Sequence, residues 1–104
     1  MRSVVFRGIV EQTAVVAAVE EMPGSVLHRI RLALDAPLDI QKGEAMAVNG
    51  VCITVRQVEA LAIEAVIWQD TWKLTNFSQL SVGDRVNIEL PVQDGYEDIF
   101  QCER

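Results

Sequence analysis

Residues Glu44–Val55 read EAMAVNGVCITV, two short apolar runs on either side of the pair Asn49-Gly50. Asn-Gly between alternating apolar residues is a strong signal for a two-residue β-hairpin, because the type I′ turn needs a positive φ at both central positions. The stretch therefore predicts a hairpin of strands Ala45–Val48 and Val51–Glu59. The turn also sets the register, in which Val48 faces Val51, Ala47 faces Cys52, Met46 faces Ile53 and Ala45 faces Thr54.

This register gives the two faces of the hairpin different compositions. Opposed residues share a face and neighbours alternate, so one side is apolar and is assigned to the core. That side comprises Met46, Val48, Val51 and Ile53. The other side, which we call the small-residue wall, comprises Ala45, Ala47, Cys52 and Thr54. Two interpretations of the wall remain open: it accepts a planar ring, or its small residues pack against another element of the same chain.

Further short runs rich in Val and Ile lie between turn signals, at the roughly 8–12-residue spacing of an all-β sandwich or closed barrel. The expected strands outside the hairpin are Val4–Val10, Thr13–Glu20, Val26–Leu34, Ala62–Trp68 and Arg85–Leu90. Residues Thr71–Phe77 lack strict alternation and are predicted to form a short helix, with Asp70 or Thr71 supplying the N-cap oxygen.

The strand that follows the hairpin repeats the division into two faces. Its core face comprises Ile63, Ala65 and Ile67, and its outer face comprises Glu64, Val66 and Trp68. A large amphipathic ring is unfavourable to leave exposed. We therefore expect Trp68 to stack on a ligand, to cover an interface or to lie beneath the helical segment 71–77.

Length and charge exclude several classes of protein. A chain of 104 residues is about the size of one domain. Its formal charge of −6 has the wrong sign for a nucleic-acid surface. The longest uncharged stretch runs only from Ala45 to Val55, well short of the roughly 20 apolar residues that span a membrane. The start of the chain lacks the apolar region of a secretory signal, so we expect a cytoplasmic protein.

Other candidate functional groups are few. Two cysteines, Cys52 and Cys102, and one histidine, His28, do not make a recognisable zinc site. We expect both cysteines to be reduced, Cys52 to be a small apolar filler, and His28 to be a surface or packing residue. The sequence contains no glycine-rich phosphate loop, paired-carboxylate motif or metal-ligand spacing. We therefore assign no metal and no catalytic residue.

Three segments, taken in order, resemble a known family. They are Phe6–Glu11 (FRGIVE), Ala47–Val55 (AVNGVCITV) and Asp70–Phe77 (DTWKLTNF), the last followed by Val82–Asn87 (VGDRVN). Together they resemble the lumazine-binding barrel of riboflavin synthase, specifically its amino-terminal half. The likeness spans roughly residues 5–90, and the hairpin is its most specific part.

The resemblance implies a six-stranded Greek-key closed barrel with a short helix, in a single domain. We accordingly divide the chain into a barrel, residues 1–90, and an acidic C-terminal tail, residues 91–104. Riboflavin synthase has two such barrels, and it converts two molecules of 6,7-dimethyl-8-ribityllumazine into riboflavin and a ribitylamino-pyrimidine without a metal or organic cofactor. Its ligands lie against the outside of one barrel and are covered by the other, which agrees with the outward direction of the small-residue wall.

The resemblance also nominates ligand-binding residues. Cys52 and Thr54 match pocket-wall positions, and Val66–Trp68 resembles the strand whose backbone groups address the pyrimidine edge of the ring. Asp70 stands where the family pattern usually has Glu. The complete set is Phe6, Val10, Ala45, Ala47, Cys52, Thr54, Val66, Ile67, Trp68, Asp70 and Thr71.

Several departures from the family pattern bear on activity. Ala45 stands where the family commonly has Ser, Arg7 stands where it commonly has Thr, and Trp68 is bulkier than the usual residue. The second barrel opens with a histidine-bearing motif, and Pro91–Arg104 does not resemble that motif.

These observations favour a single barrel that binds 6,7-dimethyl-8-ribityllumazine, riboflavin or FMN on its outer face, as a homodimer or another homo-oligomer. One alternative is an active riboflavin synthase, a transferase, whose site forms between protomers, because its chemistry places two lumazines together. A second alternative is an interaction module that binds no such ligand. We expect no required cofactor and no nucleic-acid or membrane partner.

Overall fold

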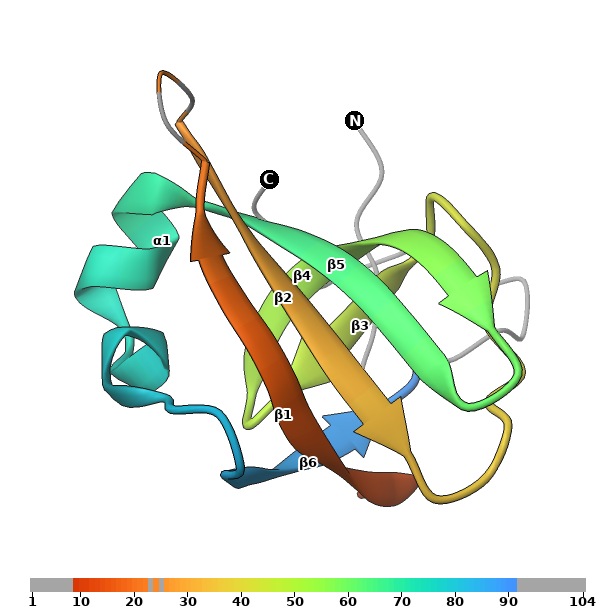
Figure 1. Ribbon diagram of the computed structural model, residues 1–104. Coiled ribbons are helices and arrows are strands. Elements are labelled where there is room, and N and C mark those ends of the chain that lie inside the picture. Colours follow the sequence, from red (N-terminus) through yellow and green to blue (C-terminus); the bar gives the residue numbers. More distant parts are fainter. Residues whose placement is uncertain (1–8, 23, 25, 92–104) are drawn as a thin grey trace.

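The computed structural model describes residues 9–22, 24 and 26–91. Six antiparallel strands close into a barrel in the order β1-β2-β5-β4-β3-β6 (Figure 1). The strands are β1 (Gln12–Glu21), β2 (Leu27–Leu34), β3 (Ala45–Val48), β4 (Val51–Glu59), β5 (Ala62–Trp68) and β6 (Arg85–Glu89). A short helix, α1 (Gln69–Leu74), and a 3-10 turn, η1 (Asn76–Gln79), connect β5 to β6. The expected closed six-stranded barrel with a short helix is confirmed.

Closure of the barrel depends on β6, which pairs with β1 on one edge and with β3 on the other. Strand β2 pairs with β5 rather than with its successor β3, which makes a Greek-key connection. Register shifts occur between Val16 and Ala18 in β1 and between Val55 and Gln57 in β4. Such bulges bend and twist a strand, as a small closed barrel requires.

The Asn-Gly hairpin has the predicted register at all of its paired positions. Asn49 and Gly50 have φ angles of 49° and 82°, the left-handed values of a type I′ turn. The Asn49 side-chain oxygen accepts a hydrogen bond of 2.8 Å from the Asn87 backbone N–H. The Asn49 N–H in turn donates to the Asn87 carbonyl at 2.9 Å. The turn therefore ties β3 to β6 where the barrel closes.

The core fills the interior of the barrel and contains the apolar face of the hairpin. Met46, Val48 and Ile53 are at most 1% exposed, and Val51 is half-buried against the same cluster. Phe77 from η1 is fully buried there as well. The other buried members are Ala14, Val16, Ile30, Leu32, Leu34, Ile40, Val55, Ile63, Ala65, Ile67, Val86 and Ile88. Because the predicted core face is inside, the small-residue wall faces outward.

The ends of the barrel differ from the sequence predictions. The expected first strand, Val4–Val10, falls largely outside the described residues, and its described members Ile9 and Val10 are not in a strand. The prediction is therefore wrong at those two positions. The expected boundary between a barrel and a tail stays a prediction, because residues 92–104 lie outside the described part.

The helix also begins earlier than predicted, at Gln69 rather than Thr71. Its N-cap is Trp68, with no side-chain hydrogen bond, so the predicted cap by Asp70 or Thr71 is wrong. The reason is that the Gln69 N–H donates to the Val26 carbonyl at 2.7 Å, which carries the β2–β5 pairing directly into the first helical residue. The helix also ends earlier than predicted, at Leu74 rather than Phe77, and the hydroxyl of its C-cap residue, Thr75, donates to the Thr71 carbonyl at 2.7 Å.

Candidate functional site

The small-residue wall lies on the outer face of β3 and β4 and continues onto β5. Ala45, Thr54 and Val66 are direct neighbours across the three strands and form one row. Ala47 and Cys52 face each other in the next row of the hairpin. Ala47 is buried, whereas the other four residues are half-buried. Each of the two interpretations of the wall therefore applies to part of it. Ala47 is packed, whereas the row through Thr54 keeps surface that a planar ring could contact.

Thr54 is the polar member of that row. Its neighbours Ala45 and Val66 have apolar side chains, and its hydroxyl makes no hydrogen bond within the described part of the chain. No buried side-chain oxygen or nitrogen in this part lacks a partner, so the Thr54 hydroxyl is not buried and is open to solvent. A ligand lying on the row can therefore exchange a water for a direct hydrogen bond at Thr54.

Cys52 corrects an expectation from the sequence. It is disulfide-bonded rather than reduced, and the described residues contain no free cysteine. Residue counts did not predict this, because two cysteines in a chain do not define a disulfide framework. Cys102 lies outside the described residues. Cys52 therefore contributes a disulfide sulfur to the wall, not an ionisable thiol.

The three predicted site residues of β5 point in different directions. Val66 and Trp68 share the outer face, whereas the Ile67 side chain lies in the core and is 2% exposed. Ile67 is also paired with His28 of β2. Only the backbone of Ile67 can contribute to a site on the outer face, as the resemblance had implied for this strand.

Trp72, not Trp68, is the aromatic residue packed between the helix and the barrel. The Trp72 ring stacks on His28, with centroids 4.5 Å apart and planes within 4°, and it meets Phe77 edge to face at 6.1 Å. His28 is 5% exposed, which confirms a packing role. Trp68 is 36% exposed at the end of β5, so its ring is left on the outer surface. Sequence reasoning missed Trp72, although it and Phe77 are the two aromatic residues of the predicted helical segment.

The remaining nominated residues lie at the margins of the wall. Asp70 is exposed and Thr71 is half-buried in the first turn of α1, directly after Trp68. Val10 is 50% exposed. The N–H of the next residue, Glu11, donates to Ile88 of β6, so β6 lies between this part of the chain and β3. Phe6 lies outside the described residues.

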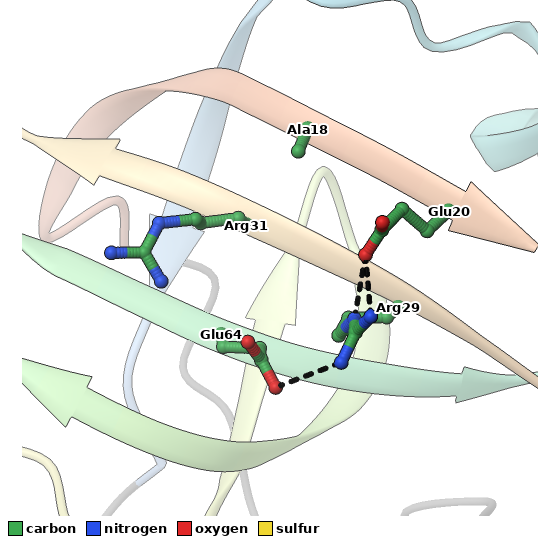
Figure 2. A pocket seen from close by; sticks show the side chains of 5 residues that line it. All are labelled: Ala18, Glu20, Arg29, Arg31 and Glu64. Atoms are coloured by element: carbon green, nitrogen blue, oxygen red, sulfur yellow. Dashed lines mark hydrogen bonds and ion pairs between the residues drawn. The ribbon is translucent and has the colours of Figure 1, made fainter. Parts of the chain in front are cut away.

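A charged hollow adjoins the wall on the side of β2 and was not identified from the sequence. It has a volume of about 250 Å³ and is lined by Ala18, Glu20, Arg29, Arg31 and Glu64 (Figure 2). Arg29 lies directly opposite Val66, the last member of the wall row, and Arg31 lies opposite Glu64. The available signal was the alternation in β2, where Arg29 and Arg31 alternate with the buried residues His28, Ile30 and Leu32 and so face outward.

Within the described residues, no group of three or more His, Cys, Asp or Glu side chains is placed to hold a metal ion. The same part of the chain contains no helix long and apolar enough to cross a membrane.

The chain resembles known proteins over most of its length. It is 35% identical over 85 residues to riboflavin synthase of Escherichia coli (strain K12), an alignment that covers 81% of this chain and 39% of that one. It is 32% identical over 90 residues to riboflavin synthase of Schizosaccharomyces pombe, covering 84% and 42%. The chain thus spans about two fifths of the length of these relatives.

Solved structures with the same fold include two complexes of LumP. The complex with 6,7-dimethyl-8-(1'-D-ribityl) lumazine has a TM-score of 0.72 at 26% identity, covering 88% of this chain and 51% of that one. The complex with riboflavin has a TM-score of 0.68 at 27% identity, covering 83% and 46%. The family model of the lumazine binding domain matches residues 7–91. With its closed barrel and its match over most of its length, the chain belongs to the lumazine binding domain family.

Proposed function

We propose that this barrel binds 6,7-dimethyl-8-ribityllumazine or a flavin on its outer face. The observation that carries the proposal is the half-buried row Ala45–Thr54–Val66, which has only small or β-branched side chains and one available hydroxyl. The LumP complexes with ribityllumazine, riboflavin and flavin mononucleotide support the same class of ligand. Such a molecule would be a bound ligand and not a required cofactor.

Each part of the wall would have a distinct role. Half-buried Ala45 would let a planar ring approach the sheet closely, buried Ala47 would support the wall beside it, and the Thr54 hydroxyl would make a hydrogen bond to a polar atom at the edge of the ring. Trp68, two residues beyond Val66 on the same face of β5, offers an exposed aromatic ring for stacking. The others, Phe6, Val10, Cys52, Val66, Ile67, Asp70 and Thr71, would border the ligand or address it through backbone groups.

A ligand on this outer face would keep one side open to water, so we also propose that the chain forms a homodimer or another homo-oligomer. The chain spans less than half of the length of the riboflavin synthases that it matches. A symmetric pair of walls would cover both ligands with the same surface patch on each protomer.

The test is a titration of the purified protein with riboflavin, followed by quenching of flavin fluorescence. It is run with and without a thiol reductant, because Cys52 of the wall is disulfide-bonded. We expect saturable quenching at micromolar protein in at least one of the two conditions. The proposal is wrong if neither condition quenches riboflavin and the protein neither carries nor binds a lumazine chromophore. Light scattering checks assembly, and a monomer in the presence of saturating ligand would exclude the oligomer.

A second function is favoured by the riboflavin synthase relatives, namely catalysis at a site assembled between two protomers. Bringing two bound lumazines together would supply proximity and orientation, which contribute at most about 7–11 kcal/mol in intramolecular reactions. Incubation with 6,7-dimethyl-8-ribityllumazine distinguishes the two functions. Riboflavin release over many turnovers would show an enzyme, whereas stoichiometric binding without product would leave the binding function alone.

A further inference from the structure

The charged hollow continues the same surface on which the ligand is proposed to lie, so a role for it in binding rests on the proposed function. Arg29 is the cross-strand neighbour of Val66, and residues in such a pair have Cβ atoms about 5 Å apart. A substituent of several carbons on a ring held at Thr54 and Val66 would therefore reach the hollow. The ligands proposed above carry such a substituent, the ribityl chain.

Carboxylates hold the arginines of the hollow. Glu20 Oε1 accepts from Arg29 Nε at 2.7 Å and lies 2.7 Å from Arg29 Nη2. On the other side of the guanidinium, Arg29 Nη1 is 3.9 Å from Glu64 Oε2 (Figure 2). Arg31 Nη2 is 2.6 Å from Glu59. Glu64 is the least exposed of these charged side chains, at 16%. It lies on the outer face of β5, two residues from Val66 of the wall row.

The same pairing extends to every arginine in the described part of the chain. The pairs are Arg29 with Glu20 and Glu64, Arg31 with Glu59, Arg56 with Glu64, and Arg85 with Asp35. Among these arginines, no guanidinium near the wall is left to neutralise an anion. Among the described residues, the charge around the hollow therefore does not attract a phosphate, and the chain as a whole carries a formal charge of −6.

The chemistry of the hollow suits hydroxyl groups. A hydroxyl both donates and accepts, so it can accept from Arg29 Nη1 and donate to a Glu64 oxygen at the same time. A phosphate dianion only accepts, and it would meet the Glu20 and Glu64 carboxylates at close range. A polyol therefore finds both a hydrogen-bond donor and a hydrogen-bond acceptor in the hollow. Its phosphate ester could accept hydrogen bonds from Arg29, but it would be repelled by the negative charges of Glu20 and Glu64.

We propose that Glu20, Arg29 and Glu64 form a specificity-determining subsite that receives the uncharged polyol chain of the ligand and discriminates against its phosphate ester. Neutral ribityl compounds then bind this barrel more tightly than flavin mononucleotide. Glu64 is the principal discriminating group, because it lies between Arg29 and Arg56 and is the least exposed member of the subsite.

The experiment compares the Kd of riboflavin with the Kd of flavin mononucleotide for the wild-type protein, Glu64→Gln and Asp35→Asn. Asp35→Asn is a matched control, because it removes one carboxylate that is paired with an arginine, Arg85, away from the hollow. We expect the wild type to favour riboflavin. Glu64→Gln should raise the relative affinity for flavin mononucleotide about two- to fivefold, the size of a surface charge interaction. Asp35→Asn should leave the ratio unchanged.

The outcomes separate this inference from the proposed function. If riboflavin binds but Glu64→Gln leaves the ratio unchanged, or if Asp35→Asn shifts it equally, the subsite is wrong and the binding function stands. A wild type that prefers flavin mononucleotide also overturns the subsite. If no flavin or lumazine binds at all, both proposals fail. Should Glu64→Gln not fold, as judged by circular dichroism, Glu20→Gln at the more exposed partner provides the same comparison.

Discussion

Replacing Thr54 by Val tests whether the outward row of the hairpin is the ligand site. The change keeps the shape of a β-branched side chain and removes only the hydroxyl, which makes no hydrogen bond within the described residues. The barrel should therefore fold with unchanged stability. A ligand would lose one hydrogen bond, with a net value of about 0.5–1.5 kcal/mol, so its Kd should rise about two- to tenfold.

The assay is the riboflavin fluorescence titration, with thermal unfolding measured on the same samples. Thr13→Val is a suitable control because Thr13 is a half-buried strand residue paired with β6, away from the wall. It removes the hydroxyl that accepts from Arg85 and should leave the Kd unchanged. If Thr54→Val melts like the wild type and binds riboflavin with the same Kd, Thr54 is not in the site and the reasoning from the wall is refuted.

Three further substitutions test the fold that positions the wall. Ile53→Ala, on the core face next to Thr54, should lower the free energy of unfolding in urea by about 2–5 kcal/mol. A loss no larger than that from Thr54→Val would mean that the register assigned to the hairpin is wrong by one residue. Gly50→Ala should destabilise the barrel by about 1–2 kcal/mol in thermal melts. The cause would be backbone strain alone, because the φ of Gly50 is 82° and an added Cβ would meet no atom within 4 Å. An unchanged melting temperature would contradict a type I′ turn. Trp72→Ala should reduce the free energy of unfolding by about 3 kcal/mol and remove near-ultraviolet circular dichroism, because the Trp72 ring stacks on His28. Trp68→Ala should have the smaller effect, because Trp68 is exposed. The reverse order would mean that Trp72 does not hold the helix against the barrel.

The local part of the fold could be predicted from the sequence. The turn at Asn49 and Gly50 has few conformations open to it, and once its type is known, period-2 alternation assigns every hairpin residue to a face. This is why the register and the outward direction of Thr54 were both predicted correctly.

Features that depend on distant residues could not be predicted in the same way. The start of α1 follows from a hydrogen bond between Gln69 and Val26, and the packing of Trp72 follows from His28 on another strand. A short helix has no strong periodicity of its own, so tertiary contacts decide its ends. The charged hollow was missed for the same reason, since Arg29 meets Glu64 and Val66 only when β2 pairs with β5.

The double hydrogen bond between Asn49 and Asn87 has a consequence for the order of folding. A hairpin with a two-residue turn forms within about 1–10 μs because its contacts are local, whereas β6 must find both β1 and β3 across a long stretch of chain. Once the hairpin turn has formed, the Asn49 side chain can offer the incoming strand an acceptor, the one that binds the Asn87 N–H in the folded barrel. We expect the hairpin to form early and β6 to dock on it last, so that closure of the barrel by β6 is the slow step of folding.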